Sequence, residues 1–399
     1  MPILVGLGML GIVVVIIGGL LAGSMLLARG SGASPSTAAA SATPSSSASA
    51  SAEESPTPEP TPAVEFITAG SMVQPRASAT ATLLQDGRVL IAGGWIADQK
   101  ATNTAEIYDP KTSKFTATGS MHSARVWHVA TALTDGRVLM TGGSDGSGRV
   151  ASAEIYDPKT GRFAVTGSML AARVEHTATL LADGRVLVAG GYNKGPHLAT
   201  AELYDPKTGH FTATGSMSGA RGGAVAALLP NGHVLIAGGG NLEVALSTAE
   251  LYDLRSGKFT KTGPMAEVRQ YSAAVVISQG RCLVAGGYDS DYNALDSAEL
   301  YDSSSGAFQP AGPMTSPRSE EAEVMLQNGS VLLAGGITGD TTLDSAEVFD
   351  PATATFAPTS SMLEARSHPS AVLLRDGRVL LAGGWSETDT VLSSAEIYG

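Results

Sequence analysis

One pattern restricts the fold of this chain more than any other: a glycine pair returns seven times, at a spacing of 48 or 49 residues. The pairs stand at 93–94, 142–143, 190–191, 238–239, 286–287, 335–336 and 383–384. Self-similarity at a fixed period of this length indicates a repeat architecture, in which each unit packs mainly against its neighbours. The sequence therefore predicts seven copies of one supersecondary unit.

Each unit reads as four short β-strands. In the third unit, "TATLL" and "RVLVAGG" flank an Asp-Gly pair, which is a strong hairpin signal. "AELYDP" then ends in a proline-led turn, and "HFTATG" forms the fourth strand. A content of 48 glycines and 43% hydrophobic residues with few aromatics suits many short strands and tight turns. We expect an all-β protein.

The glycine pair, the unit length, and a tyrosine separated by six residues from a phenylalanine resemble the kelch repeat of β-propellers, such as the central domain of galactose oxidase. The resemblance covers residues 64–399 and implies a seven-bladed propeller. Copper-radical oxidases share this fold, and their cofactor needs a tyrosine crosslinked to a cysteine, with histidine and tyrosine ligands. The single cysteine, Cys282, stands in a column otherwise filled by valine, where we expect a buried apolar residue. No such ligand set can be assembled, and no cofactor is predicted.

The two ends of the repeat region predict how the ring closes. The outer-strand phenylalanine follows six of the "AE" strands, but the chain ends at "SSAEIYG" before a seventh. The missing one is supplied by Phe66 in "VEFITAG", ahead of the first complete unit. We therefore predict that this N-terminal strand pairs with Ala395–Tyr398, which completes the seventh blade and leaves no exposed sheet edge.

The first 63 residues differ from the rest. Residues 1–29 contain an apolar run of the length that spans a bilayer, and residues 30–63 form a Ser, Ala, Thr and Pro-rich linker expected to be disordered. We predict a single-pass membrane anchor with the propeller outside a bacterial cell. A cleaved signal peptide and a cytoplasm-facing scaffold remain the alternatives. A net charge of −12 argues against nucleic-acid binding, and the propeller is expected to be monomeric.

Positions that all seven units fill alike are interpreted as scaffold. One such column contains Arg76, Arg125, Arg173, Arg221, Arg269, Arg318 and Arg366, and another contains Glu106, Glu154, Glu202, Glu250, Glu299, Glu347 and Glu396. We expect these residues to be partly buried donors and acceptors that tie loops to neighbouring strands.

Exceptions to the repeat gather on one face, where strand two connects to strand three and strand four connects to the next blade. The aromatic exceptions are Trp95, Trp127, Tyr192, Tyr271, Tyr288 and Trp385. The tryptophans come from the seventh, first and second blades, so we expect one aromatic surface, flanked by His128 and His368. Flat rings beside polar groups commonly bind sugar faces or peptide side chains. Packing against adjacent loops is the alternative role.

Polar exceptions stand two, three and five residues after the scaffold arginines. They are Glu175, Glu320 and His368, then His128, His176 and Glu321, and finally Glu323, which replaces an alanine. They could be solvated mouth residues, contact a ligand, or hold a metal through His128 and His176. Glu323 is expected to have a raised pKa or an arginine partner. The Asp289, Asp291 and Asn293 spacing is only a weak calcium signal, and no metal site is predicted.

We therefore predict a propeller that binds a carbohydrate or protein on its loop-rich face. The alternative is a sugar-active enzyme, similar to mutarotases or lyases, with His176, Glu321 and Glu323 as acid and base candidates.

Overall fold

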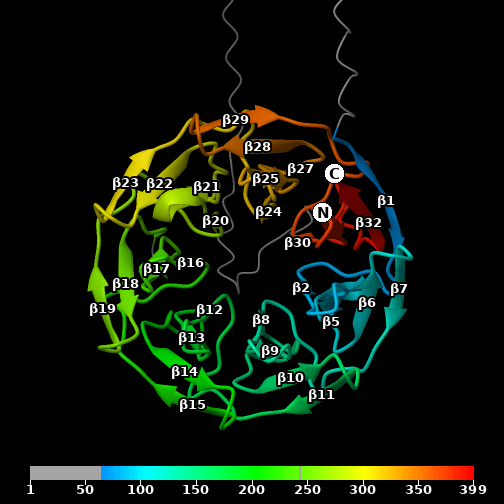
Figure 1. Cartoon of the computed structure of the whole chain (residues 1–399), viewed down its shortest axis with the longest axis horizontal. Helices are drawn as coiled ribbons and strands as arrows, with labels where there is room; N and C mark the ends of the chain where they lie inside the picture. The colour runs from blue at the N-terminus through cyan, green and yellow to red at the C-terminus, as the bar shows by residue number, and fades with distance from the viewer. Residues whose placement is uncertain (1–63, 242–243) are drawn as a thin grey trace, which may run out of the picture. The chain divides into compact units, whose positions relative to one another are not determined.

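The computed structural model describes residues 64–241 and 244–399, and within them seven four-stranded antiparallel sheets form a ring. Figure 1 shows the sheets as blades around a central axis, with one strand of each nearest the axis and one at the rim. Val64–Gly399 is one compact unit. The predicted anchor at 1–29 and linker at 30–63 lie outside the described residues. Within the described ranges, no helix has the length and apolar character needed to cross a bilayer.

Each blade runs outward from its first strand, and the bounds are as follows. Blade 1 contains β2 (Thr80–Leu83), β3 (Val89–Ala92), β6 (Ala105–Asp109) and β7 (Lys114–Ala117). Blade 2 contains β8 (Val129–Ala132), β9 (Val138–Thr141), β10 (Ala153–Asp157) and β11 (Arg162–Val165). Blade 3 contains β12 (Thr177–Leu180), β13 (Val186–Ala189), β14 (Ala201–Asp205) and β15 (His210–Ala213). Blade 4 contains β16 (Val225–Leu228), β17 (Val234–Ala237), β18 (Ala249–Asp253) and β19 (Lys258–Lys261).

The remaining blades follow the same order. Blade 5 contains β20 (Ala273–Val276), β21 (Arg281–Ala285), β22 (Ala298–Asp302) and β23 (Ala307–Pro310). Blade 6 contains β24 (Ala322–Met325), β25 (Val331–Ala334), β28 (Ala346–Asp350) and β29 (Thr355–Pro358). Blade 7 contains β30 (Ser370–Leu373), β31 (Val379–Ala382), β32 (Ser394–Tyr398) and β1 (Phe66–Ser71). Two small ribbons, β4 (Trp95–Ile96) with β5 (Lys100–Ala101) and β26 (Ile337–Thr338) with β27 (Thr341–Thr342), and two 3₁₀ turns, η1 (Ala97–Gln99) and η2 (Ser278–Gly280), complete the described structure.

The ring closes as the sequence predicted. Strand β1 pairs antiparallel with β32, with Phe66 opposite Tyr398 and Ile67 opposite Ile397. The Phe66 and Tyr398 ring centroids lie 4.8 Å apart. In Figure 1 the blue first strand lies beside the red last one. Joining the two ends of the propeller in one blade removes the free sheet edge that an open ring would expose.

The core lies between blades, where the inward faces of neighbouring sheets interdigitate. Cys282 belongs to one such cluster, is fully buried, and packs with Val284 and Tyr301, which confirms the predicted apolar role. The glycine pairs permit this close packing. A Cβ on Gly93, whose φ is +65°, would lie 2.6 Å from the carbonyl oxygen of Arg125 in the next blade. Only glycine fits a left-handed backbone at such an approach.

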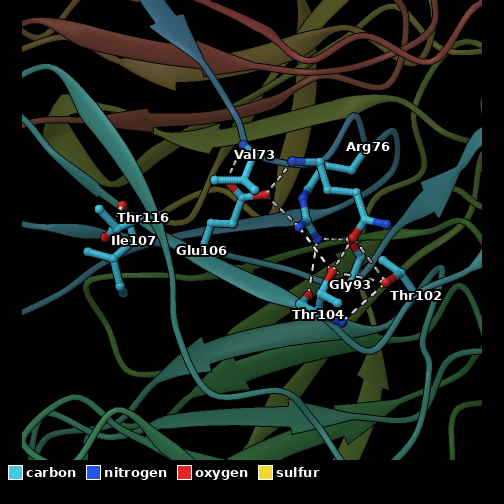
Figure 2. Close-up of polar contacts among 9 residues, drawn as sticks. Val73, Arg76, Gly93, Thr102, Thr104, Glu106, Ile107 and Thr116 are labelled. Carbon is cyan, nitrogen blue, oxygen red and sulfur yellow. Dashed lines mark hydrogen bonds and ion pairs between the residues drawn. The ribbon is translucent and has the colours of Figure 1, made fainter.

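The arginine and glutamate columns form one buried node per blade, as predicted. Figure 2 shows the node of blade 1, where Arg76 donates to the carbonyl oxygen of Gly93 at 2.9 Å and to Glu106 at 2.8 Å. Arg76 also donates to the carbonyl and hydroxyl oxygens of Thr104, both at 3.1 Å, and Glu106 accepts from the Val73 backbone N–H at 2.7 Å. Each node ties the connection arriving from the preceding blade to the third strand, so the loop-rich face rests on a rigid frame.

Candidate functional site at the channel mouth

The second residue after each scaffold arginine adopts a left-handed backbone in all seven blades. The φ angles are 52° for Ser78, 52° for Trp127, 55° for Glu175, 59° for Gly223, 52° for Tyr271, 59° for Glu320 and 51° for His368. A left-handed conformation costs a residue other than glycine roughly 1–2 kcal/mol. Six of these seven positions nevertheless carry a side chain, and such outliers concentrate at functional sites.

These residues are neighbours around the central axis of the ring, at the inner edge of the loop-rich face, which we call the mouth. The Tyr271 N–H donates to the carbonyl oxygen of Gly223 at 2.9 Å, and the Gly223 N–H donates to that of Glu175 at 3.0 Å. Likewise, the His368 N–H donates to the Glu320 carbonyl oxygen at 2.9 Å. The backbone is thus nearly the same in every blade, and only the side chains differ around the mouth. We call this set the mouth ring.

The residue after each glycine pair extends the mouth ring outward, because it forms a backbone bridge to the residue before a ring member. Trp95 bridges to Ala77 in this way, and Trp385 bridges to Ser367. The half-buried rings of Trp95 and Trp127 meet edge to face, with centroids 5.1 Å apart and planes at 80°. Among residues 64–241 and 244–399, no ring contact joins Trp385 to this pair. Ring contact therefore joins two of the three tryptophans of the predicted aromatic surface, Trp95 and Trp127, on blades 1 and 2.

A hydrogen bond crosses the opposite side of the mouth, over blade 4. The Tyr271 hydroxyl donates to Glu175 Oε2 at 2.8 Å, although the two residues belong to blades 5 and 3. The ring passes over Gly223, where an added Cβ would lie 2.9 Å from a Tyr271 ring carbon. Burial raises the pKa of Glu175 to about 7, against the lowering effect of the tyrosine hydrogen bond. This carboxyl group therefore titrates near neutral pH.

Glu320 and His368 are neighbours in the mouth ring. His368 Nδ1 and Glu320 Oε2 lie 3.1 Å apart, at ion-pair distance but without the geometry of a hydrogen bond. Burial raises the pKa of Glu320 to about 8 and lowers the pKa of His368 to about 4. Both groups are consequently neutral at pH 7, and the contact is polar rather than ionic.

His128 and His176 lie below the mouth, between blades, and not on its surface. Each is about 95% buried, and His128 Nε2 lies 3.2 Å from the Thr80 hydroxyl of the preceding blade. His176 Nε2 lies 2.9 Å from the Thr141 hydroxyl, which belongs to the second strand of the preceding blade. Burial lowers the pKa of both imidazoles to about 3. Their position indicates that both imidazoles pack between neighbouring blades.

Glu321 fills in blade 6 the position that His128 fills in blade 2, beside the first glycine of the preceding pair. Both of its carboxylate oxygens are buried without a hydrogen-bond partner, as is one oxygen of Glu323. Burial raises the pKa of Glu321 to about 8, and burial together with the charge of Glu321 raises the pKa of Glu323 well above its usual range. The raised pKa predicted for Glu323 is thus confirmed, without an arginine partner.

Several residues near the mouth were missed by the sequence analysis because they lie in the variable loops. Arg149 places its guanidinium carbon 4.5 Å from the centroid of the Tyr192 ring, and His197 packs on that ring at 5.2 Å. Tyr292 lies 6.0 Å from Tyr288, centroid to centroid. The only available signal was their place in the loops between strands two and three.

Metal ligation finds no support in the described part of the chain, where no group of three or more His, Cys, Asp or Glu side chains is arranged to hold an ion. The Asp289 carboxylate accepts hydrogen bonds from the backbone N–H groups of Asp291 and Asn293, both at 2.8 Å, and so caps its own loop.

A groove of about 650 Å³ lies on the opposite face, between the turns of blades 1 and 2. Two of the arginines that line it form solvent-accessible ion pairs with neighbouring aspartates, Arg88 with Asp86 at 2.6 Å and Arg137 with Asp135 at 2.7 Å. Such surface pairs contribute little energy. The mouth, which holds buried and unpartnered groups, is therefore the stronger candidate site.

Comparison with known families agrees with this architecture. The kelch motif model matches residues 76–122, 128–170, 176–218 and 271–315. The chain is a kelch-repeat β-propeller. Among solved structures, this kelch propeller resembles a fungal alcohol oxidase of the AA5 family in complex with copper, with 20% identity and a TM-score of 0.67 over 83% of this chain and 76% of that one. A search of curated proteins gives no match.

The likeness to the oxidase extends to the fold alone at this level of identity. The buried Cys282 thiol lies in the second strand of blade 5, and burial raises its pKa far above the usual value. A thiol held in an apolar cluster, with no nearby set of metal-ligating side chains in the described ranges, does not fit a copper centre.

Proposed function

We propose that this kelch propeller is a carbohydrate-binding protein whose site is the mouth ring on the loop-rich face. The observation that carries the proposal is the left-handed backbone shared by seven positions, six of which bear side chains of different chemistry. A scaffold selected for stability alone would place glycine there. Binding sites commonly retain such local strain because it presents the side chains that the ligand requires.

The two sides of the mouth offer what a sugar needs. The Trp95 and Trp127 pair presents half-buried indole surface for an apolar sugar face. Across the mouth, Glu175, Tyr271 and Glu320 offer carboxyl and phenol groups that donate and accept hydrogen bonds. This combination of flat apolar surface and convergent polar groups is typical of small-ligand sites.

The test is a glycan array probed with the full-length protein, followed by calorimetric titration of any glycan that binds. We expect at least one glycan to bind and Trp127→Ala to weaken it at least tenfold. Lys159→Ala, on the opposite face, is the matched control and should leave affinity unchanged. Kelch propellers generally mediate protein interactions, so a protein ligand is the alternative. Glycan binding that survives Trp127→Ala would contradict the assignment of the mouth.

A sugar-active enzyme is the second candidate, favoured by Glu321, whose pKa of about 8 would keep it protonated as a general acid at neutral pH. Product analysis after incubation with any bound glycan separates the two functions.

We also propose that residues 1–29 anchor the protein in a bacterial membrane, with the propeller outside. Amino-terminal sequencing of the mature protein distinguishes an anchor from a cleaved signal. Protease accessibility in intact cells tests which side of the membrane the propeller occupies.

A further inference from the structure

We infer that the side of the mouth formed by blades 3, 5 and 6 binds an organic ammonium group, and that the ligand is an amino sugar. The inference rests on the proposed carbohydrate-binding function and specifies the chemical class of the ligand. It is carried by three tyrosine rings and two carboxyl groups that the fold gathers in one place: Glu175, Tyr271, Tyr288, Tyr292 and Glu320.

The tyrosines form an incomplete cage. Tyr271 and Tyr288 meet nearly perpendicular, with centroids 6.5 Å apart and planes at 79°, and Tyr292 lies 6.0 Å from Tyr288. Tyr292 is 42% exposed, so the cage opens to solvent at its outer rim. The Tyr288 hydroxyl is hydrogen-bonded to Ser319, and Tyr292 to Gln270, which hold their rings in place. A tyrosine ring attracts a cation placed over its negative face, and we assign these three rings as the walls of the ammonium site.

The carboxyl groups can supply the negative charge that complements an ammonium group. Glu175 is oriented by the Tyr271 hydroxyl at 2.8 Å, and the Glu320 side chain is about 91% buried beside His368. Glu321, next in the chain, lies behind them between the blades, with both oxygens buried and unpartnered. A buried polar group without a partner costs about 1–3 kcal/mol. An ammonium group that enters beside these carboxyl groups would stabilise their charged forms more strongly than a neutral hydroxyl, which offers a hydrogen bond but no positive charge.

Most of the surrounding positively charged side chains already interact with other residues. Arg318 is paired with Glu347 at 2.9 Å, and Arg269 with Glu299 at 3.3 Å, within the scaffold nodes. Arg149 acts on Glu175 from the loop of blade 2 and stacks on Tyr192. His368 is neutral at pH 7 because burial lowers its pKa to about 4. The carboxyl side of the mouth therefore has unmet capacity for positive charge.

Proton release on binding distinguishes an ammonium ligand from a neutral sugar. The pKa of Glu175 is about 7 and that of Glu320 about 8, so at pH 7 much of this pair is protonated. A bound ammonium lowers both values and expels on the order of one proton into the buffer. A neutral sugar at the same place leaves the protons bound.

The experiment compares three β-1,4-linked tetrasaccharides that differ only at carbon 2: glucosamine, N-acetylglucosamine and glucose oligomers. Calorimetric titration of the full-length protein at pH 5.5, where the glucosamine amines are already protonated and Glu175 and Glu320 still hold their protons, gives affinity and proton release together in buffers of different ionisation enthalpy. We expect the glucosamine oligomer to bind at least tenfold more tightly than the other two and to release about one proton. Spermidine, an ammonium without a sugar, is titrated alongside.

Two sets of variants separate the two sides of the mouth. Glu175→Gln and Glu320→Gln should remove the preference for glucosamine and the proton release, whereas Trp127→Ala should weaken all three oligomers by a similar factor. Tyr271→Phe keeps the cage ring, removes the bond to Glu175, and should weaken glucosamine binding by less than Glu175→Gln does. Thermal denaturation verifies that each variant is folded.

Each outcome decides between the inference and the function beneath it. Equal affinity for the three oligomers would overturn the ammonium site and leave carbohydrate binding standing. Binding of spermidine alone would support the ammonium site and overturn the carbohydrate function. Binding of neither class would overturn both.

Discussion

Glu321→Gln tests the electrostatics of the buried layer beneath the mouth with the least change in shape. The substitution keeps the side chain nearly isosteric and removes only its ability to ionise. Wild-type Glu321 has both carboxylate oxygens buried and unpartnered, and burial raises its pKa from 4.5 to about 8. The glutamine amide lies in the same unpartnered surroundings, so the comparison isolates the cost of the charge.

The sign of the effect follows from linkage. Because the folded-state pKa of Glu321 is raised, its protonated form contributes stability that is fully present below the unfolded pKa of 4.5 and is lost as pH rises through about 8. Each pKa unit corresponds to about 1.4 kcal/mol. Relative to the glutamine variant, wild type therefore loses roughly 3 kcal/mol by pH 7 and roughly 5 kcal/mol above pH 8.

Thermal denaturation of both proteins from pH 4.5 to pH 9 measures this difference. For a domain of this size, 1 kcal/mol shifts Tm by roughly 1–2 °C, so we expect coincident Tm values at pH 4.5 and the variant about 4–5 °C higher at pH 7. Glu106→Gln is the matched control. It breaks a buried ion pair with Arg76 and should destabilise by roughly 3–5 kcal/mol at pH 7. A Glu321→Gln variant that is less stable than wild type at pH 7, or equally stable throughout, would refute the reasoning.

Three further predictions address closure, the aromatic platform and the cross-blade hydrogen bond. A shortened chain that begins at Met72 lacks β1, exposes the edge of β32, and should aggregate or melt roughly 10 °C lower in a heating scan; equal Tm values would contradict closure. Trp95→Ala and Trp127→Ala should each weaken glycan binding at least tenfold while Tm changes little; the reverse pattern would assign the rings to inter-blade packing. Gly223→Ala should displace the Tyr271 ring, because the added Cβ would lie against it. Burial holds the pKa of Tyr271 well above 10 in the wild-type protein, so absorbance at 295 nm should show one more tyrosine titrating near pH 10 in the variant. An unchanged titration curve would argue against the hydrogen bond that crosses blade 4.

The fold was predictable because every structural requirement is written seven times. Each repeat contains the glycine pair, the arginine and glutamate columns and the same strand order. A residue type that recurs in all seven repeats can therefore be told from one that occurs by chance. Ring closure could be predicted by counting strands, because the strand of Phe66 and the strand of Tyr398 each lacked a partner within its own repeat. The packing role of Cys282 followed from its column.

The mouth was predictable only as a list of exceptions. Its left-handed backbone has no sequence signal, since glycine occupies that position in one blade alone, at Gly223. The direction in which a side chain points was also not predictable from the sequence. His128 packs between blades, whereas Glu175 of blade 3 accepts a hydrogen bond from Tyr271 of blade 5, with blade 4 between them. Contacts of this kind depend on the diameter of the ring, which no single repeat encodes.

The division between scaffold and mouth explains how one repeat can carry an irregular site. Each buried node pins its connection with charge-assisted hydrogen bonds from one arginine, as Arg76 does with Gly93 and Glu106. The backbone at the mouth is therefore set before any mouth side chain contributes, and seven ring positions can differ in chemistry without changing the fold. The burial that shifts the pKa values of Glu320 and Glu321 is imposed by the same frame. Stability that the nodes supply thus offsets the strain and the unpartnered carboxyl groups near the mouth, and a change in a node should alter binding only through loss of the fold.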